Sequence, residues 1–254
     1  MLMDEEKWVE NLKDIKDILD GAGVKYWLDL GTLLGAIRDG KFIPWDTDID
    51  IGTMCTETDK LIGTIPEIER KGFKVDITDY GIFILKKPVT ISISLYRLKG
   101  EKAWKLGYIP ETPKFSKFAR YLGLLGERIL YRSLPSRTKM PYLRQKIAFA
   151  LIPSFADHQT RKFSFRVHEW LGGKYCAFVI PKSYYENLDS ISFYSMAFNI
   201  PSHVHDYLSL YYGENWRNPQ QNWAYSQYPA IDYNFDIGKR EDLSIWGYLK
   251  ELKK

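Results

Sequence analysis

The chain has 254 residues, of which 45% are hydrophobic, 27% charged and 15% aromatic. This composition excludes an intrinsically disordered, collagen-like or coiled-coil protein, and the length is sufficient for one large domain with a sizeable core. The net charge of +4 is too small by itself to indicate nucleic-acid binding, and we expect no nucleic-acid partner. No segment approaches the roughly 18 consecutive apolar residues of a membrane-spanning helix.

The N-terminus and the cysteines bear on location. The first twenty residues are acidic and amphipathic, whereas a secretory signal begins with a basic stretch followed by an apolar one. Cys55 and Cys176 are too few for a disulfide framework or for a zinc site made of cysteines. We therefore expect a reducing compartment and a cytoplasmic location, with membrane association as the alternative.

The pattern of apolar residues predicts alternating helices and strands over the first hundred residues. Trp8 and Leu19 bound a row of apolar residues at helical spacing, which predicts a helix over residues 4–20 that ends at Gly21 and Gly23. Further helices are predicted at 31–40 and 57–71, and strands at 24–30, 47–53, 73–78, 82–85 and 89–98. This order indicates an α+β fold with helices around one sheet.

The rest of the chain differs in charge and in aromatic content. Residues 110–166 contain twelve Lys or Arg and three Asp or Glu, and their apolar spacing predicts basic amphipathic helices. These helices are compatible with contact to an anionic membrane surface, with binding of a polyanionic acceptor, or with an ordinary solvated outer face. The chain from about residue 174 is aromatic, and we expect it to be irregular.

Three carboxylates stand at alternate positions, Asp46, Asp48 and Asp50. In an extended segment they point to one face, while Ile49 and Ile51 face the core. Carboxylates so close together repel one another unless a cation lies among them. Hard oxygen ligands of this kind suit Mg²⁺ or Mn²⁺, which commonly bind one or two carboxylates together with substrate phosphates.

A turn into a helix precedes these carboxylates, at Gly31 and Thr32. The backbone N–H groups at a helix N-terminus stabilise a phosphate. A carboxylate metal site facing an anion-binding turn indicates transfer at phosphorus, where positioning and charge neutralisation provide most of the catalysis. The spacing alone leaves two other interpretations open, a solvated acidic loop and an isolated calcium site.

The segment over residues 31–51, GTLLGAIRDGKFIPWDTDIDI, resembles the signature of the LicD/fukutin family within the nucleotidyltransferase-fold superfamily. Residues 201–223, PSHVHDYLSLYYGENWRNPQQNW, are similar to the C-terminal YG-x-x-W region of the same family. The resemblance implies a mixed β-sheet flanked by helices. It also implies one unit over residues 1–254, made of a nucleotidyltransferase-like core (1–105), a basic helical segment (106–173) and an aromatic C-terminal segment (174–254).

The activity that this resemblance implies is transfer of a phospho-alditol or phosphocholine group. The donor would be CDP-linked, the acceptor a glycan or lipid-linked glycan hydroxyl, and the released product CMP, with Mg²⁺ or Mn²⁺ as cofactor. Peripheral membrane contact would bring a lipid-linked acceptor within reach. The alternatives are a nucleotidyltransferase that modifies a small molecule and releases pyrophosphate, and a non-catalytic nucleotide- or glycan-binding module.

The resemblance also assigns roles to residues of the motif. Gly31 and Thr32 would hold donor phosphate, and Arg38 would contact phosphate bidentately, a surface salt bridge being its alternative. Asp48 and Asp50 would bind the metal, Asp46 would be the third acidic member, and Asp46 or Asp50 would accept the proton of the acceptor hydroxyl.

The chain departs from the family pattern on a neighbouring strand. Where relatives carry a further acidic residue, the inward positions here are Ser92 and Ser94. The site therefore has fewer carboxylates, or Asp76 or Asp79 substitutes, or the site is degenerate and inactive.

Aromatic residues near the C-terminus supply further candidates. Trp216, Trp223 and Tyr225 would stack on a cytosine or sugar ring, or would pack against the core. We expect His203 and His205 to make ordinary polar contacts rather than to bind zinc.

Overall fold

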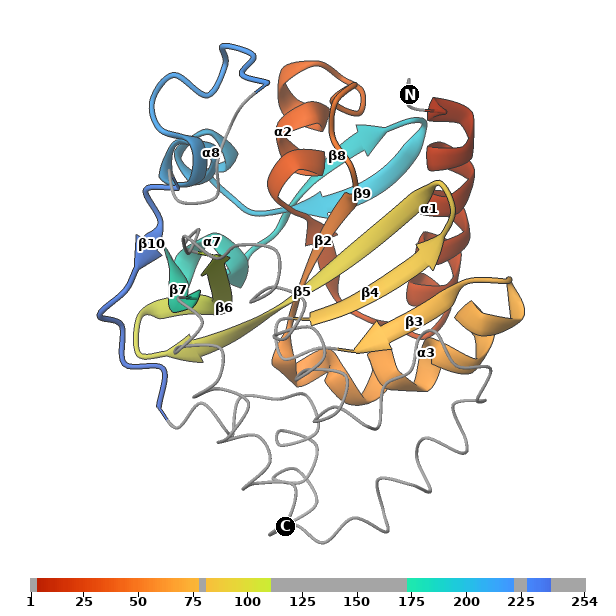
Figure 1. Ribbon diagram of the computed structural model, residues 1–254, viewed down its shortest axis with the longest axis horizontal. Coiled ribbons are helices and arrows are strands. Elements are labelled where there is room, and N and C mark those ends of the chain that lie inside the picture. The colour runs from red at the N-terminus through yellow and green to blue at the C-terminus, as the bar shows by residue number, and fades with distance from the viewer. Residues whose placement is uncertain (1–3, 78–80, 111–172, 222–227, 239–254) are drawn as a thin grey trace, which may run out of the picture.

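The computed structural model describes residues 4–77, 81–110, 173–221 and 228–238, which form a mixed β-sheet flanked by helices (Figure 1). This arrangement confirms the expected fold class. The predicted basic helices of the middle segment lie outside the described residues, and so do Asp79, Trp223 and Tyr225. Within the described part of the chain, no helix combines the length and the apolar character needed to span a membrane.

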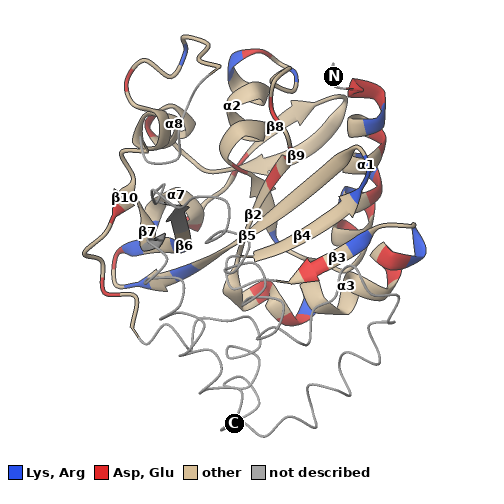
Figure 2. Cartoon of the chain, viewed as in Figure 1, with Lys and Arg blue, Asp and Glu red and all other residues tan. Residues whose placement is uncertain are grey.

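Two helices cover one face of the sheet. Helix α1 (Glu5–Gly21) buries its predicted apolar side and displays charged residues outward (Figure 2). Its first turn is capped by the Asp4 side chain, and the chain leaves it through Gly23, whose φ of +64° favours glycine. Helix α3 (Thr58–Arg70) follows a 3-10 turn and packs beside α1. The predictions of helices at 4–20 and 57–71 are thus confirmed.

The central part of the sheet is built from the first hundred residues, in the order β1-β2-β5-β4-β3. Strands β2 and β5 are parallel, and the other neighbouring pairs are antiparallel. The strands are β1 (Tyr26–Leu28), β2 (Ile49–Met54), β3 (Lys74–Ile77), β4 (Gly81–Lys86) and β5 (Val89–Lys99).

The chain over residues 173–212 is mostly regular, so the expectation of an irregular segment from residue 174 is wrong for this part. Strands β7 and β10 pair with partners distant in the chain, which local sequence does not show, and they extend the sheet beyond β5 and β6. Strands β8 and β9 pair with each other as a hairpin and form a separate two-stranded sheet. The elements are β6 (Lys102–Pro110), β7 (Gly173–Pro181), α7 (Ser183–Glu186), β8 (Asp189–Phe193), β9 (Met196–Ile200), α8 (Val204–Tyr212) and β10 (Ile231–Asp232).

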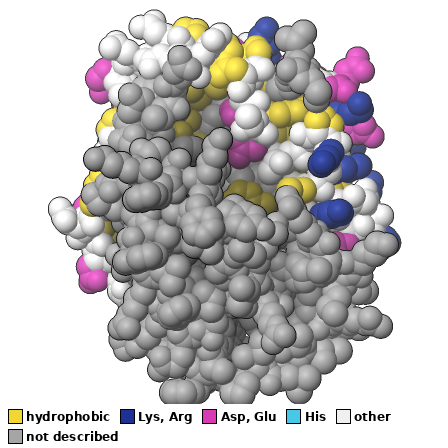
Figure 3. Space-filling model, viewed as in Figure 1, with side chains coloured by type: hydrophobic (Ala, Val, Ile, Leu, Met, Phe, Trp, Pro, Cys, Tyr) yellow, Lys and Arg dark blue, Asp and Glu magenta, His cyan; other side chains and the backbone are white. Residues whose placement is uncertain are grey.

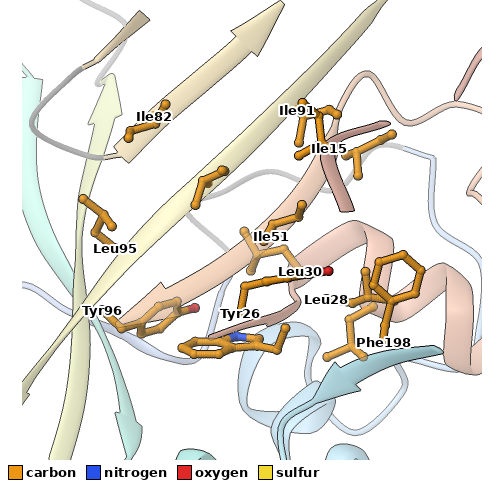
Figure 4. Packing of buried hydrophobic residues seen from close by; sticks show 14 of the residues in the cluster. Ile15, Tyr26, Leu28, Leu30, Ile51, Ile82, Ile91, Leu95, Tyr96 and Phe198 are labelled. Atoms are coloured by element: carbon orange, nitrogen blue, oxygen red, sulfur yellow. The ribbon is translucent and has the colours of Figure 1, made fainter. Parts of the chain in front are cut away.

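The core lies between the sheet and the helices that cover it. Figure 4 shows Ile15 of α1 against Ile91 of β5, and Leu28 of β1 beside Phe198 of β9. Ile49 and Ile51 are both fully buried, as their alternation with the carboxylates predicts.

Two predicted strands begin or end elsewhere, and both changes affect the candidate site. The strand expected at 24–30 stops at Leu28, because the Asp29 side chain caps helix α2 (Leu30–Arg38). Strand β2 starts only at Ile49, so Asp46 and Asp48 lie in the preceding loop. The expectation that three carboxylates share one strand face is therefore wrong for two of them.

Candidate active site

A pocket of about 220 Å³ opens where α2 and the start of β2 face the segment that follows α8. Figure 3 shows a hollow in this face of the molecule with acidic side chains beside it. Five of the residues predicted from sequence line one wall of the pocket: Gly31, Arg38, Asp46, Asp48 and Asp50. Folding thus brings the three carboxylates together even though only one of them belongs to a strand.

Asp50 is the most firmly oriented of the three carboxylates. Its Oδ1 accepts a hydrogen bond from Ser92 Oγ at 2.8 Å, and its Oδ2 accepts one from the Gly31 backbone N–H at 3.1 Å. Ser92 lies directly opposite Asp50 in the parallel pairing of β2 with β5. Ser92 therefore holds the Asp50 carboxylate in place.

Gly31 is required by the close approach of two carboxylates. A Cβ at this position would lie 2.2 Å from Asp46 Oδ2 and 3.3 Å from Asp50 Oδ2. Both oxygens thus converge on the first turn of α2, where the partial positive charge of the helix N-terminus favours anions. In the structure this helix end donates to protein carboxylates, through Gly31 to Asp50 and through Leu30 to Asp29.

Thr32 lies beneath the pocket rather than in its wall. Its side chain is buried, and Oγ1 accepts the backbone N–H of Asp50 at 2.8 Å. This contact ties the second residue of the Gly-Thr pair to the start of β2. Thr32 therefore helps to position Asp50, and the phosphate contact expected for Thr32 stays a prediction.

Burial opposes ionisation of all three carboxylates, and the charges of neighbouring carboxylates add to this effect at Asp46 and Asp50. Burial, followed by the nearby charge of Asp48, raises the pKa of Asp46 to about 6. Burial also raises the pKa of Asp48, opposed by a hydrogen bond from Thr47 and by the positive charge of Lys105. The pKa of Asp50 is raised well above its usual range by burial and by the charges of Asp48 and Asp46.

The chemistry of these donors fits a divalent cation. Hard carboxylate oxygens in a recess, where burial and neighbouring charges oppose ionisation, would be stabilised by a Mg²⁺ or Mn²⁺ ion. Among the described residues, no three Asp, Glu, His or Cys side chains already converge as a complete metal-binding group. Asp48 and Asp50, the two ligands expected from the motif, both line the pocket, and their binding of a metal ion stays a prediction.

Arg38 forms an ion pair and also lies in the pocket wall, and the phosphate contact expected for it stays a prediction. Its guanidinium donates from Nε and Nη2 to the carboxylate of Asp39, at 2.9 and 2.7 Å, and it also lines the pocket. A guanidinium has five N–H donors, so this pairing leaves others for a phosphate. Asp39 therefore fixes the plane of the guanidinium at the last turn of α2.

A buried polar network that the sequence did not predict lies behind Asp50. The carboxylate of Asp29 is fully buried and accepts hydrogen bonds from Tyr96 and Tyr207. Lys105, whose side chain is 6% exposed, pairs with Asp29 Oδ2 at 3.4 Å and donates to Ser94 Oγ at 3.1 Å. Asp29 also bonds through its backbone N–H to the carbonyl of Asp50, so the network supports the carboxylate strand.

Lys105→Met is expected to lower the free energy of unfolding by about 3–5 kcal/mol, because it leaves the Asp29 carboxylate buried without its cation. The double variant Asp29→Asn with Lys105→Met removes both charges and is expected to recover most of this loss. Urea denaturation followed by circular dichroism measures both. Equal stability of the single variant and the parent would show that the pair is not a buried ion pair in solution.

The remaining candidates lie in different places. Asp76 is separated from Asp50 by Phe83 and Ser92 in one row across the sheet, about 14 Å at three strand spacings. Asp76 is therefore too distant to replace the missing carboxylate. His203 lies against Tyr184, and His205 stacks on Trp216 with ring centroids 5.6 Å apart.

The opposite wall of the pocket contains side chains that sequence reasoning mostly missed. Trp216 contributes to it and is 4% exposed, so it packs into the protein as well as lining the cavity. The other residues of this wall are two tyrosines and three side-chain amides: Tyr212, Tyr228, Asn218, Gln220 and Gln221. Tyr212 and Trp216 are the first and last residues of the YG-x-x-W match, and the three amides belong to the NPQQN run that follows it.

The carboxylate segment, Gly31 and Arg38 lie within residues 23–112, which match the family model described as LicD/FKTN/FKRP, nucleotidyltransferase domain. Residues 23–112 are therefore similar to the nucleotidyltransferase domain of the LicD/FKTN/FKRP family. The resemblance seen in the motif is thereby confirmed. The match begins before β1 and ends just after β6, so it contains the whole carboxylate wall of the pocket.

Curated proteins are similar to this chain over short segments. An uncharacterized protein of Rickettsia prowazekii is 41% identical over 64 residues, which cover 25% of this chain and 24% of that protein. Ribitol 5-phosphate transferase FKRP of Homo sapiens is 44% identical over 57 residues, covering 19% of this chain and 12% of the human protein. The matched parts are thus less than a quarter of either relative.

Among solved structures, the antibiotic-resistance factor ANT(2'')-Ia is similar at 15% sequence identity and a TM-score of 0.32. The alignment covers 65% of this chain and 95% of that protein.

Proposed function

We propose that this chain is a phosphotransferase that moves a phospho-alditol or phosphocholine group from a CDP-linked donor to a glycan hydroxyl, with release of CMP. The observation that carries the proposal is the convergence of Asp46, Asp48 and Asp50 with Arg38 on one pocket. The match of residues 23–112 to the family model and the similarity to a ribitol 5-phosphate transferase support it.

The residues of the pocket would have separate roles in the transfer. Asp48 and Asp50 would hold Mg²⁺ or Mn²⁺, which supplies positive charge against the donor diphosphate when bound. Arg38 would donate to phosphate oxygens from the guanidinium N–H groups that Asp39 does not use. Ser92 and Gly31 would keep the Asp50 carboxylate in one orientation through the reaction.

Asp46 is better suited than Asp50 to accept the proton of the acceptor hydroxyl. Both oxygens of Asp50 already accept hydrogen bonds, and its side chain is 7% exposed. Asp46 is less buried, and its pKa of about 6 is near the range in which a general base works at neutral pH. In the transfer, the acceptor oxygen bonds to the phosphorus distal to cytidine, the P–O bond to CMP breaks, and the hydroxyl proton passes to Asp46.

A donor screen tests the proposal. The purified chain is incubated with CDP-choline, CDP-ribitol or CDP-glycerol in Mg²⁺ or Mn²⁺, and CMP is measured with and without a mixture of glycan acceptors. CMP release that needs the metal is the expected result. Pyrophosphate release from CTP or ATP would instead identify a nucleotidyltransferase. Donor binding without turnover would identify a non-catalytic binding module.

A further inference from the structure

Trp45 is a large aromatic side chain that lines the pocket and is exposed to solvent. Its side chain is 38% exposed, whereas Trp8, Trp27, Trp104 and Trp216 are each at most 4% exposed. Single exposed apolar residues are common on protein surfaces and need no special explanation. Trp45 differs because it lines the pocket beside the three carboxylates, whereas neither Leu98 nor Tyr233, which are also exposed, lines it.

A short, firmly held turn presents Trp45. The Asp46 backbone N–H donates to the Ile43 carbonyl at 3.0 Å, which closes a β-turn with Pro44 and Trp45 at its centre. Proline at the first central position restricts this turn before any ligand binds. Phe42, just before the turn, is buried among the rings of Trp8, Phe193 and Tyr194 and is thereby anchored.

The turn places an exposed indole next in sequence to the carboxylate assigned as proton acceptor. Trp45 and the three carboxylates line the same pocket, so a sugar ring whose hydroxyl enters the pocket comes to lie beside Trp45. A pyranose presents one apolar face of C–H groups, which packs on the electron-rich face of an indole. The facing wall offers the side-chain amides of Asn218, Gln220 and Gln221, which donate to and accept from sugar hydroxyls.

We propose that Trp45 is the stacking platform for a pyranose ring of the acceptor and a specificity-determining residue of the transfer. This inference rests on the proposed function for its place in the reaction, but the binding of a pyranose does not require turnover. The nucleoside of the donor then binds away from Trp45.

Saturation-transfer NMR tests the platform on the whole chain without turnover. The probes are methyl glucopyranoside and methyl galactopyranoside, with open-chain ribitol and CMP as comparison ligands, all in Mg²⁺. Saturation transfer to the C–H protons of at least one pyranoside is expected for the parent. It should fall at least fivefold in Trp45→Ala and stay above half in Trp45→Phe, with the CMP signal unchanged in both variants.

Tyr233→Ala is the matched control, because Tyr233 is 50% exposed and does not line the pocket. Unfolding temperature verifies that each variant is folded. Pyranoside signals that survive in Trp45→Ala, or that are absent from the folded parent, would overturn the inference. So would loss of the CMP signal in Trp45→Ala, which would place the nucleobase on the indole. A parent that binds pyranosides but releases no CMP contradicts the proposed function and leaves the platform standing.

Discussion

Asp48→Asn and Asp50→Asn are each expected to lower the rate of CMP release at least about 100-fold while the chain stays folded. Loss of one metal-binding carboxylate removes several kcal/mol of charge stabilisation from the transition state, and each 1.36 kcal/mol is a factor of ten in rate. An asparagine at position 50 can still accept from the Gly31 N–H and donate to Ser92 Oγ, so the local geometry is retained. CMP release by single-turnover assay measures the loss.

The control for both variants is Asp59→Asn, which changes an exposed carboxylate in the first turn of α3. This variant should release CMP at the parental rate. If Asp48→Asn and Asp50→Asn also keep that rate, the metal ligands and the reaction assigned to this pocket are both wrong.

Without metal, Asp46→Asn is expected to raise the unfolding temperature at pH 7.5 by several degrees. The pKa of Asp46 is raised from 3.8 to about 6, so between these values the folded chain binds more protons than the unfolded chain. The free energy of unfolding therefore decreases as pH rises through that window, and the loss remains at higher pH. Each kcal/mol regained corresponds to about 2–4 °C for a chain of this size.

Divalent metal should relieve the same repulsion. Mg²⁺ or Mn²⁺ is expected to raise the unfolding temperature of the parent at pH 7.5, and to raise it less at pH 5.5, where protons compete for the carboxylates. Differential scanning fluorimetry at both pH values, with and without metal, measures the effect. Asp48→Asn should abolish the metal-dependent shift. A metal shift of equal size at the two pH values would contradict this account.

The predictions for Asp46→Asn and for added metal depend on the same feature, the unfavourable burial of three carboxylates in one recess. Three carboxylates lie in one recess, although burial raises the pKa of each. The charges of Asp48 and Asp46 raise the pKa of neighbouring carboxylates further. A purely structural acidic loop would spread these charges into solvent. Keeping them together is characteristic of a site that binds a cation or a proton during function.

The motif and the first hundred residues were largely predictable from the sequence. The helical spacing from Trp8 to Leu19 and the alternation of Ile49 and Ile51 with carboxylates each depend on residues a few positions apart. Helical and strand periodicity is a local property, so it can be recognised without knowing the fold. Element ends were less predictable, as at Asp29, where one capping side chain turns an expected strand residue into the start of a helix.

The sequence by itself determined the fold class, the family signature and the identity of the three carboxylates. Only the tertiary structure decided what orients and surrounds them. Ser92 bonds Asp50 across 42 positions, Lys105 pairs with Asp29 across 76, and Tyr207 reaches Asp29 across 178. Such contacts arise from strand pairing and from the burial of distant segments against one another, and no local periodicity encodes which partners will meet.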